Sequence, residues 1–587
     1  MSFLKRVLST VTGIFVFLLI CFFGLILLGM LIGSGSDDVV QVKPNSVLEL
    51  KLDFPIYDYA GKTEFTDYPF LNEDEKNGLF NIIDAIKYAE TDDKIKGISI
   101  DNNFINAGIS QTKALRGALN KFKASGKFVV AYGDIYSQKD YYLSSVADTI
   151  FINPVGFLDF KGLYTERLYF KDFQDKSGFK MEVVRLGKYK SAVEPYIANE
   201  MSAENREQIL VYLNSLWNEI KQDISLSRNI TTARLNNIAD SLLARTPQMA
   251  KTSNLIDKIA YHDEYVKGMK HALKLKPNKD LNVINVADYS EYASKKINAN
   301  YSKNRIAVIY AEGDIMYGEG EKGIIGQGAM NKSLEKARND DKIKSIVIRV
   351  NSPGGSALAS ELIWREIELT KKVKPVIVSM GDLAASGGYY IASNADKIIA
   401  EPTTITGSIG VFGMLPNGKN LADNIGINAE QVATNINAVT YSFFEPLNDN
   451  QREFIKEGIL DIYDLFSRRV AEGRNLSREE VENIAQGRVW TGTDALKNGL
   501  VDELGGLDLA LQRAAEAAEI QEYQIREFPV FEKSLEKMLQ DLGIAKTKET
   551  IMTEELGEEN YKMLKELKRL SQKKGVQLLF PFSTEIK

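Results

Sequence analysis

The first apolar stretch of the chain is long and carries no charge. Residues 7–33 (VLSTVTGIFVFLLICFFGLILLGMLIG) contain no acidic or basic side chain, and a helix needs about 20 such residues to cross the hydrocarbon core of a membrane. Lys5 and Arg6 precede the stretch, and Asp37 and Asp38 follow it. Because basic flanks stay in the cytoplasm, the pattern predicts a transmembrane anchor with the rest of the chain outside the cytoplasm. The alternative is a cleaved signal peptide, whose apolar region normally spans only about 7–15 residues.

Farther along, short apolar runs alternate with stretches of helical periodicity. Residues 345–350 (SIVIRV) and 375–379 (PVIVS) are strand-like, and residues 360–371 (SELIWREIELTK) between them have apolar side chains at helical spacing. A strand, a helix and a strand at this spacing are typical of right-handed βαβ units. The continuous apolar character of the strands predicts buried, mainly parallel sheets and therefore an α/β fold.

This pattern occurs twice, because the sequence contains an internal repeat at an offset of 248 positions. DDKIKGISI at Asp92 matches DDKIKSIVI at Asp340, and YYLSSVADTIFINP at Tyr141 matches YYIASNADKIIAEP at Tyr389 without a gap. The similarity continues on both sides of these blocks, so that each copy covers about 220 residues. We therefore expect two tandem repeats of one fold.

The repeats divide the chain into five predicted parts. The anchor takes residues 1–33, the first repeat 45–270 and the second repeat 304–530. A polar segment rich in lysine and asparagine, 271–303, is interpreted as the connection between the repeats, and 531–587 forms a charged tail. Apolar residues at helical spacing in the tail predict an amphipathic helix, used for core or subunit packing rather than membrane contact. These residues are Leu535, Met538, Leu539 and Leu542.

The composition limits the classes of function. Of the 587 residues, 44% are hydrophobic and 26% are charged, which is ordinary for a folded protein and argues against global disorder. The net charge is -6 and the pI is about 5.5, so no basic surface indicates nucleic-acid binding. Cys21 is the single cysteine and lies in the apolar run, so the fold must hold without an intrachain disulfide.

A candidate nucleophile follows a strand of the second repeat. Residues 375–379 lead through MGDLAA to Ser386, and Gly387 and Gly388 then begin a predicted helix. A serine at this point meets the positive end of the helix dipole, where free backbone N–H groups bind anions. A second glycine loop, 351–356 (NSPGGS), also follows a strand, at the edge where open α/β sheets bind ligands. One loop can present the nucleophile while the other supplies oxyanion donors.

Each glycine loop, taken singly, is explained as an ordinary turn, and the comparison between the repeats is what favours a site. Where the second repeat has Gly354 and Gly355, the first has Asn-Ala at 106–107. Where the second repeat has Ser-Gly-Gly from Ser386, the first has Gln-Lys-Asp at 138–140. Glycines needed only for the fold would occur in both repeats, so we expect specialised chemistry in the second.

The base that activates this serine is not expected to be histidine. The two histidines, His262 and His271, lie near the end of the first repeat with no motif around them, which argues against a Ser-His-Asp triad. Lysine is the main alternative, provided that burial excludes water and lowers the lysine pKa toward neutrality.

One lysine is singled out by the alignment of the two repeats. GKYKSAVEP at 187–195 corresponds to TYSFFEP at 440–446, which puts Lys190 opposite Tyr441. The first repeat thus has a lysine without a serine, and the second a serine without a lysine. This complementarity predicts one catalytic site to which both repeats contribute.

These residues resemble signal peptide peptidase A, the long, duplicated, membrane-anchored form of bacterial protease IV and a relative of the Clp protease and crotonase fold. The most specific motifs are GKYKSAVEP, RVNSPGGSA, GDLAASGGYYIAS, TGSIGVFG and RVWTGTDALKNGLVDELGG, and the similarity covers nearly all of the chain after the anchor. The resemblance implies Ser386 as the nucleophile, Lys190 as the general base and Ser408 as a hydroxyl that orients the lysine. The expected oxyanion donors are the N–H groups of Gly387 and of Gly354 or Gly355.

The same resemblance implies further properties of the protein. It implies a homo-oligomer, commonly a tetramer, that needs no cofactor or metal and degrades signal peptides left in the bacterial inner membrane, from the periplasmic side. Two rival functions remain: a crotonase-like acyl-CoA enzyme and a membrane-anchored scaffold without chemistry. The loop at 61–77 and the tail after Glu532 fit the family pattern less well, and neither receives a function.

Overall fold

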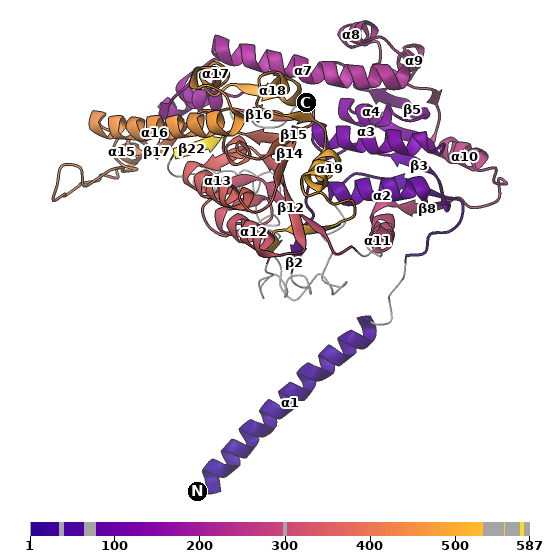
Figure 1. The fold of residues 1–587 in the computed structure, drawn as a ribbon, viewed down its shortest axis with the longest axis horizontal. Helices are drawn as coiled ribbons and strands as arrows, with labels where there is room; N and C mark the ends of the chain where they lie inside the picture. The colour runs from indigo at the N-terminus through magenta and orange to yellow at the C-terminus, as the bar shows by residue number, and fades with distance from the viewer. Residues whose placement is uncertain are drawn as a thin grey trace.

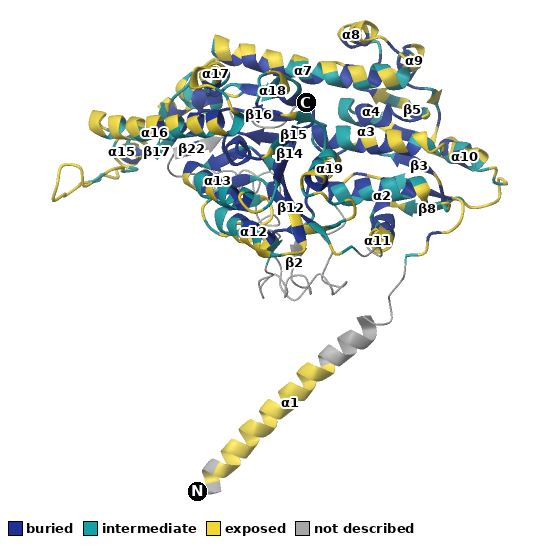
Figure 2. Ribbon diagram, viewed as in Figure 1, coloured by how far each residue is buried: buried dark blue, intermediate teal, exposed yellow. Residues whose placement is uncertain are grey.

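The computed structural model describes residues 2–33, 40–63, 78–297, 302–531, 557 and 576–579. Within these residues, two α/β units lie side by side and a long N-terminal helix extends away from both (Figure 1). A large buried core lies inside each unit (Figure 2). A smaller buried cluster packs residues of the two repeats together. The amphipathic helix predicted for the tail lies outside the described residues. The same holds for residues 64–77, which make up most of the loop 61–77.

The first repeat is built on a six-stranded parallel sheet with the order β7-β5-β4-β3-β1-β8. Its strands are β1 (Ser46–Leu50), β3 (Ile95–Asp101), β4 (Phe128–Tyr136), β5 (Thr149–Leu158), β7 (Lys258–Ile259) and β8 (Asn282–Asn285). Its helices are α2 (Leu79–Thr91), α3 (Ile109–Ala124), α4 (Gln138–Ser144), α8 (Thr232–Asp240), α9 (Pro247–Thr252), α10 (His262–Ala272) and α11 (Val286–Ile297). Helices α2, α3 and α4 each precede the next long strand, as the βαβ pattern predicts.

The second repeat has the same plan, with the main strand order β18-β16-β14-β12-β9-β20. Its strands are β9 (Arg305–Glu312), β12 (Ile343–Ser352), β14 (Val376–Ala385), β15 (Lys397–Ala400), β16 (Ile405–Gly407), β18 (Val489–Thr491), β19 (Glu503–Leu504) and β20 (Gln524–Phe528). Its helices are α12 (Gln327–Asn339), α13 (Ala357–Lys371), α14 (Gly387–Ala392), α17 (Arg478–Ile484), α18 (Gly492–Lys497) and α19 (Leu507–Ala517). Strands β12, β14 and β15 begin 248 positions after β3, β4 and β5. The prediction of an α/β fold in two tandem repeats is confirmed.

The segment 271–303, expected to be a connection, contains structure that belongs to the first repeat. Strand β8 pairs with β1 at the edge of the first sheet, and α11 packs on α2. Val286, Tyr289 and Ala293 of α11 are buried. Their helical spacing was obscured in the sequence by the surrounding lysines and asparagines, so the first repeat extends beyond residue 270.

An arm of the first repeat reaches across the second. Strand β6 (Lys180–Arg185) pairs antiparallel with β17 (Phe412–Asn417) of the second repeat. The same arm holds α5 (Lys171–Ser177), η3 (Ser191–Val193), α6 (Glu194–Ile197) and α7 (Ala203–Arg228). Helix α7 runs along the top of both repeats in Figure 1, and its Ser215 hydroxyl lies 2.9 Å from that of Thr491. Parts of the two repeats are therefore interlocked.

A third sheet joins the arm to the second repeat, with the order β11-β10-β13-β22-β17-β6. Its remaining strands are β10 (Asp314–Met316), β11 (Ile324–Gly326), β13 (Gly354–Ser356) and β22 (Val576–Leu579). Helices α15 (Lys419–Asn424) and α16 (Asp449–Arg474) follow β17 and form an arm of the second repeat. The short strands β2 (Lys62–Thr63) and β21 (Val530–Phe531) pair with each other.

The predicted N-terminal apolar helix is confirmed as α1 (Ser2–Gly33). From Lys5 to Gly24 it is long and apolar enough to cross a membrane, and every side chain in this span is exposed (Figure 2). An apolar surface of this kind is unfavourable in water and favourable in lipid.

Candidate active site

Ser386 lies at the turn between β14 and α14, with φ 56° and ψ −115°. A non-glycine residue pays about 1–3 kcal/mol for such a conformation, and it persists only where the surroundings enforce it. The Ser386 N–H donates to the carbonyl of Gly407 at 2.8 Å, and the Ser386 carbonyl accepts from the N–H of Tyr390 at 2.8 Å. The backbone on both sides of the serine is thus held, and its fully buried side chain is aimed by the turn.

The two glycine loops meet at this serine. A Cβ added to Gly387 would lie 3.1 Å from both the Cα of Gly354 and the N of Gly355, and 2.8 Å from the hydroxyl of Ser360. A Cβ on Gly388 would lie 2.8 Å from the carbonyl oxygen of Ser352. Backbones at this separation leave no room for side chains. The lysine and aspartate at these positions of the first repeat do not fit such a contact.

One of the two candidate donors on the second loop is already engaged. The N–H of Gly354 donates to the Ser352 hydroxyl at 3.1 Å, and that hydroxyl donates to the carbonyl of Gly313 at 2.7 Å. This chain of hydrogen bonds fixes the loop beside Ser386. Of the two candidate donors, Gly354 therefore already has an acceptor within its own loop.

Lys190 comes from the arm of the first repeat, just after β6, and its side chain is completely buried. The Lys190 Nζ lies 2.8 Å from the Oγ of Ser386. The same nitrogen lies 3.0 Å from the Oγ of Ser408 and donates to the Ser408 carbonyl at 3.1 Å. The structure therefore brings together, in one chain, the three side chains that the sequence singled out.

Burial controls the charge of this lysine. Removal from water lowers the pKa of Lys190 well below its ordinary value of 10.5, and desolvation is the sole cause of the shift. An ammonium ion without water or a carboxylate is unfavourable, so burial shifts the equilibrium of this lysine toward the neutral amine. A neutral amine has a lone pair that can accept the proton of the Ser386 hydroxyl.

The space for Lys190 is made by two glycines that approach it from the second repeat. A Cβ added to Gly487, whose φ is +84°, would lie 2.6 Å from the Cβ of Lys190. A Cβ on Gly410 would lie 3.2 Å from the Cδ of Lys190. Gly410 belongs to a motif noted in the sequence, but Gly487 was missed. Its signal was its place immediately before the motif RVWTG.

A buried polar cluster ties the nucleophile strand to the first repeat. Asp382, four positions before Ser386, accepts the N–H of Ser110 at 2.7 Å. Burial, with the Asp58 carboxylate as a second cause, raises the pKa of Asp382 to about 6. Arg349 of β12 donates to Asp58 at 2.8 Å, and both side chains are nearly inaccessible to water. Sequence reasoning missed this cluster, since its partners lie up to 291 positions apart.

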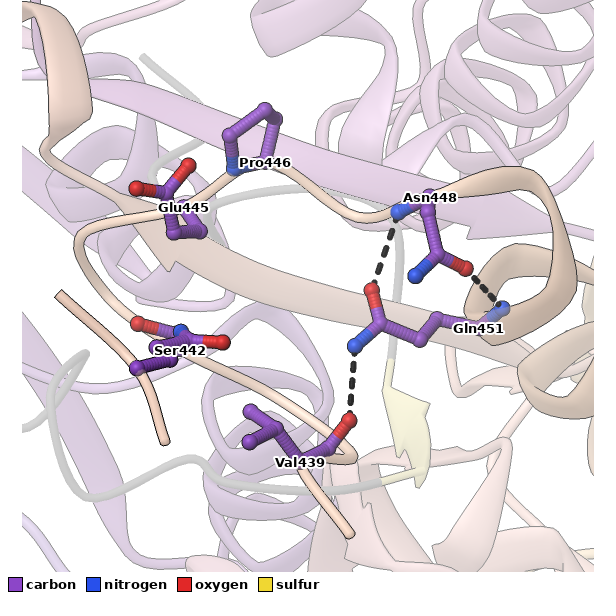
Figure 3. A pocket seen from close by; sticks show the side chains of 7 residues that line it. Val439, Ser442, Glu445, Pro446, Asn448 and Gln451 are labelled. Atoms are coloured by element: carbon purple, nitrogen blue, oxygen red, sulfur yellow. Dashed lines mark hydrogen bonds between the residues drawn. The ribbon is translucent and has the colours of Figure 1, made fainter. Parts of the chain in front are cut away.

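A pocket of about 300 Å³ lies elsewhere, in the arm of the second repeat (Figure 3). Gln451 and Asn448 bond to each other there in a helix cap, and Gln451 also donates to the carbonyl of Val439 at 2.8 Å. These polar groups satisfy one another. The pocket contains none of the residues around Ser386 and plays no part in the site.

Comparison with known proteins identifies the family of this chain. The model of peptidase family S49 matches residues 121–276 and 368–521, one segment in each repeat. The chain belongs to peptidase family S49. It is 39% identical to Protease 4 of Haemophilus influenzae over 465 residues, 78% of this chain and 75% of that protein.

Two further relatives of this S49 member extend the comparison. Protease 4 of Salmonella typhi is 38% identical over 461 residues, 77% of this chain and 74% of that protein. The chloroplastic serine protease SPPA of Arabidopsis thaliana is 33% identical over 437 residues, 74% of this chain and 64% of that protein. The S49 member described here is accordingly a serine protease.

Proposed function

We propose that this S49 protein is a membrane-anchored endopeptidase in which Ser386 and Lys190 form a catalytic dyad. The observation that carries the proposal is the 2.8 Å separation of Lys190 Nζ and Ser386 Oγ in a site closed to water. A nucleophile and a base at hydrogen-bond distance are the minimum that covalent peptide hydrolysis requires.

The chemistry follows from the two groups. Neutral Lys190 accepts the hydroxyl proton of Ser386 while Oγ bonds to the carbonyl carbon of the substrate. The carbonyl oxygen becomes negative and is held by the N–H groups of Gly387 and Gly355. Collapse of this intermediate breaks the C–N bond, and the Lys190 ammonium returns its proton to the leaving amine. Water then hydrolyses the ester on Ser386, with Lys190 again acting as the base.

Ser408 has a positioning role in this proposal. Its hydroxyl and carbonyl both contact the Lys190 nitrogen, so they fix the direction of the lone pair that faces Ser386. Replacing Ser408 by alanine should lower kcat and also change the apparent pKa of the rising limb of activity, because the amine loses one partner. A purely structural role for Ser408 would leave that pKa unchanged.

The direct test is labelling with a fluorophosphonate probe, which forms a covalent bond with an activated serine. We expect labelling of Ser386 in the full chain and no labelling in Ser386→Ala. The full chain should also hydrolyse a peptide, whereas Ser386→Ala should not. Absence of labelling in the full chain would remove Ser386 from the role of nucleophile.

The proposed substrates are signal peptides that remain in the membrane after secretion. The apolar anchor helix α1 and the motifs shared with signal peptide peptidase A support this class. A panel of synthetic signal peptides, with products identified by mass spectrometry, tests it. Matched controls of equal length have serine and glycine in place of the apolar segment. Equal kcat/KM for the two sets would contradict the proposed preference.

The proposed location is the bacterial inner membrane, with the two repeats on the periplasmic side. Lys5 and Arg6 before the apolar helix support this orientation. Protease added to spheroplasts should then digest the repeats, whereas protease added to inside-out vesicles should leave them intact. The reverse pattern would contradict the orientation.

A homo-oligomer, proposed to be a tetramer, is supported by the arm of the second repeat. The arm of the first repeat packs on the second repeat. The arm of the second repeat, with α15 and α16, projects from the molecule at the left of Figure 1. Its loop exposes Val432 and Ile436 almost completely. Val432→Asp with Ile436→Asp should lower the mass of the assembly in detergent, measured by light scattering. Leu226→Asp, at another exposed apolar position, is the control.

A further inference from the structure

Helix α3 of the first repeat takes its N-terminal cap from the second repeat. The N-cap residue of α3 is Gly108, which has no side chain to accept the N–H groups of the first turn. The Asp382 carboxylate, on β14 of the second repeat, accepts the N–H of Ser110 at 2.7 Å. A Cβ added to Gly108 would lie 2.1 Å from that carboxylate. The aspartate therefore occupies the place of a cap side chain.

The corresponding helix of the second repeat is capped by its own residue. Helix α13 begins 248 positions after α3, and the hydroxyl of its N-cap residue Ser356 accepts an N–H of the first turn. In the first repeat, Asp134 is at the position that corresponds to Asp382. It is exposed, and its carboxylate accepts from the side chain of Asn153 at 2.8 Å, within its own repeat. The cap between repeats is thus an addition to the common fold.

The same turn of α3 also contacts the segment that leads to Ser408. The Ser110 hydroxyl lies 2.9 Å from the hydroxyl of Thr403, and both side chains are buried. The next residue, Thr404, donates its hydroxyl proton to the carbonyl of Gly381 at 2.7 Å. One turn of the first repeat is therefore joined to both segments of the second repeat that lead to the proposed site.

Helix α3 is in turn joined to the arm that carries Lys190. Lys113 of α3 donates to the Asp223 carboxylate of α7 at 2.7 Å. Nearer its N-terminus, α7 contributes Gln208, whose buried side chain donates to the carbonyl of Tyr189 at 3.0 Å. Tyr189 immediately precedes Lys190 in the chain. The strand of the proposed nucleophile and the loop of the proposed base are therefore attached to the same pair of helices.

We propose that Asp382 is a positioning residue, which holds the end of β14 against α3 and thereby sets the distance between Ser386 and Lys190. This inference rests on the function proposed above. Asp382 lies four positions before Ser386, in the strand that ends at the serine. Because the backbone between them is part of a sheet, a shift of Asp382 is passed on to Ser386. The separation of a nucleophile and its base is sensitive to such shifts.

Alanine substitution at corresponding positions of the two repeats tests this. Asp382→Ala should lower kcat for a peptide by about tenfold or more and leave KM within about twofold of the parent, because the side chain holds the nucleophile and not the substrate. The rate of fluorophosphonate labelling should fall with kcat. Asp134→Ala is the matched control and should change neither. Equal kcat in Asp382→Ala and the parent would overturn the proposal.

Asparagine at this position provides the conservative variant. Asp382→Asn keeps a side-chain oxygen that can accept the N–H of Ser110, so it should retain kcat within about threefold of the parent. A fall in kcat as large as that of Asp382→Ala would mean that the hydrogen bond to α3 is not the reason for the loss, and would also overturn the proposal.

A cap supplied by the first repeat separates positioning from folding. In Gly108→Ser combined with Asp382→Ala, the new hydroxyl can accept an N–H of α3 as Ser356 does in α13, and loss of the carboxylate makes room for it. The midpoint of thermal unfolding should return toward that of the parent, whereas kcat should stay low because β14 is no longer held by α3. This double variant carries the test even where Asp382→Ala alone does not fold.

The outcomes distinguish this inference from the proposed function. Recovery of kcat together with the thermal midpoint in the double variant would mean that Asp382 serves folding alone, and with Ser386 labelled in the parent it would leave the protease intact. Absence of labelling and hydrolysis in the parent and in every variant would remove both proposals.

Discussion

Lys190 Nζ and Ser386 Oγ lie 2.8 Å apart although 196 positions separate the two residues in the chain. The first repeat supplies the lysine through its arm, and the second supplies the serine at the end of β14. Each repeat lacks the residue that the other supplies. Under the proposed function both repeats therefore contribute to one site, and the interface between them sets its geometry.

The proposed dyad predicts that substitution of either Ser386 or Lys190 abolishes activity. Ser386→Ala and Lys190→Met should each lower kcat/KM by about a thousandfold or more, because members of a dyad act as a unit. Methionine fills a volume similar to that of lysine, so packing around the buried side chain is kept. Kinetics on a synthetic peptide measure the loss, and the midpoint of thermal unfolding controls for folding. More than a few per cent of residual activity would exclude the substituted residue from the dyad.

The lowered pKa of Lys190 predicts the pH dependence of the reaction. The base acts only when neutral, so kcat/KM should rise with pH through the pKa of the lysine in the free enzyme. Because burial lowers that pKa, the rise should be complete well below pH 10.5, the ordinary pKa of a lysine. A pH series of kcat/KM from pH 5 to pH 11 provides the measurement. Activity that increases only near pH 10 would contradict a desolvated base.

The same pKa makes stability depend on pH with a defined sign. Between the lowered pKa of folded Lys190 and the pKa of about 10.4 in the unfolded chain, the unfolded state binds the extra proton. The free energy of unfolding due to this residue therefore rises with pH in that window. The loss of stability caused by burying Lys190 is largest below the pKa of the folded state. It disappears above the pKa of the unfolded state.

Lys190→Met removes this titration and serves as the reference. The difference in unfolding midpoint between Lys190→Met and the parent, in favour of methionine, should be larger at neutral pH than near pH 10. Differential scanning calorimetry at several pH values measures it. A difference that stays constant with pH would mean that the folded and unfolded pKa values of Lys190 are alike.

Much of the site could be predicted because the sequence contains its own comparison. Gly354 and Gly355 in one repeat, against asparagine and alanine in the other, separate residues of the site from residues of the fold. The strands and helices were predictable because the apolar period is a local property. Lys190 was identified because the second repeat has Tyr441 at the corresponding position. The structure places Lys190 beside Ser386.

The features that were missed depend on pairing between distant segments. The contact of Asp382 with Ser110, and the insertion of β22 beside β13, join residues more than 200 positions apart. A strand pattern indicates which face is buried, but not which strand lies beside it. The strand β8 was missed for a different reason, since four residues at a sheet edge in a polar segment give a weak local signal.

The close approach of Gly487 to Lys190 gives the last prediction, for which the chain offers a matched control. Alanine at Gly487 would place its Cβ 2.6 Å from both the Cβ and the N of Lys190. Alanine at Gly499, where φ is +81°, would meet its nearest atom, in the side chain of Leu476, at 3.5 Å. Both substitutions impose a left-handed conformation on alanine, at a cost of about 1–2 kcal/mol. Only Gly487→Ala also pushes the lysine backbone away from its position.

A displacement of about 1 Å in a catalytic group can lower the rate about a hundredfold, so we expect kcat/KM to fall by about that factor in Gly487→Ala and to change little in Gly499→Ala. Similar thermal midpoints for the two variants would show that the shared backbone cost is the same. The rate of fluorophosphonate labelling should fall with kcat/KM, because the probe reports activation of Ser386 rather than peptide binding. Equal activity in the two alanine variants would mean that the second repeat does not fix the position of Lys190, and that the interlocking of the repeats contributes to folding alone.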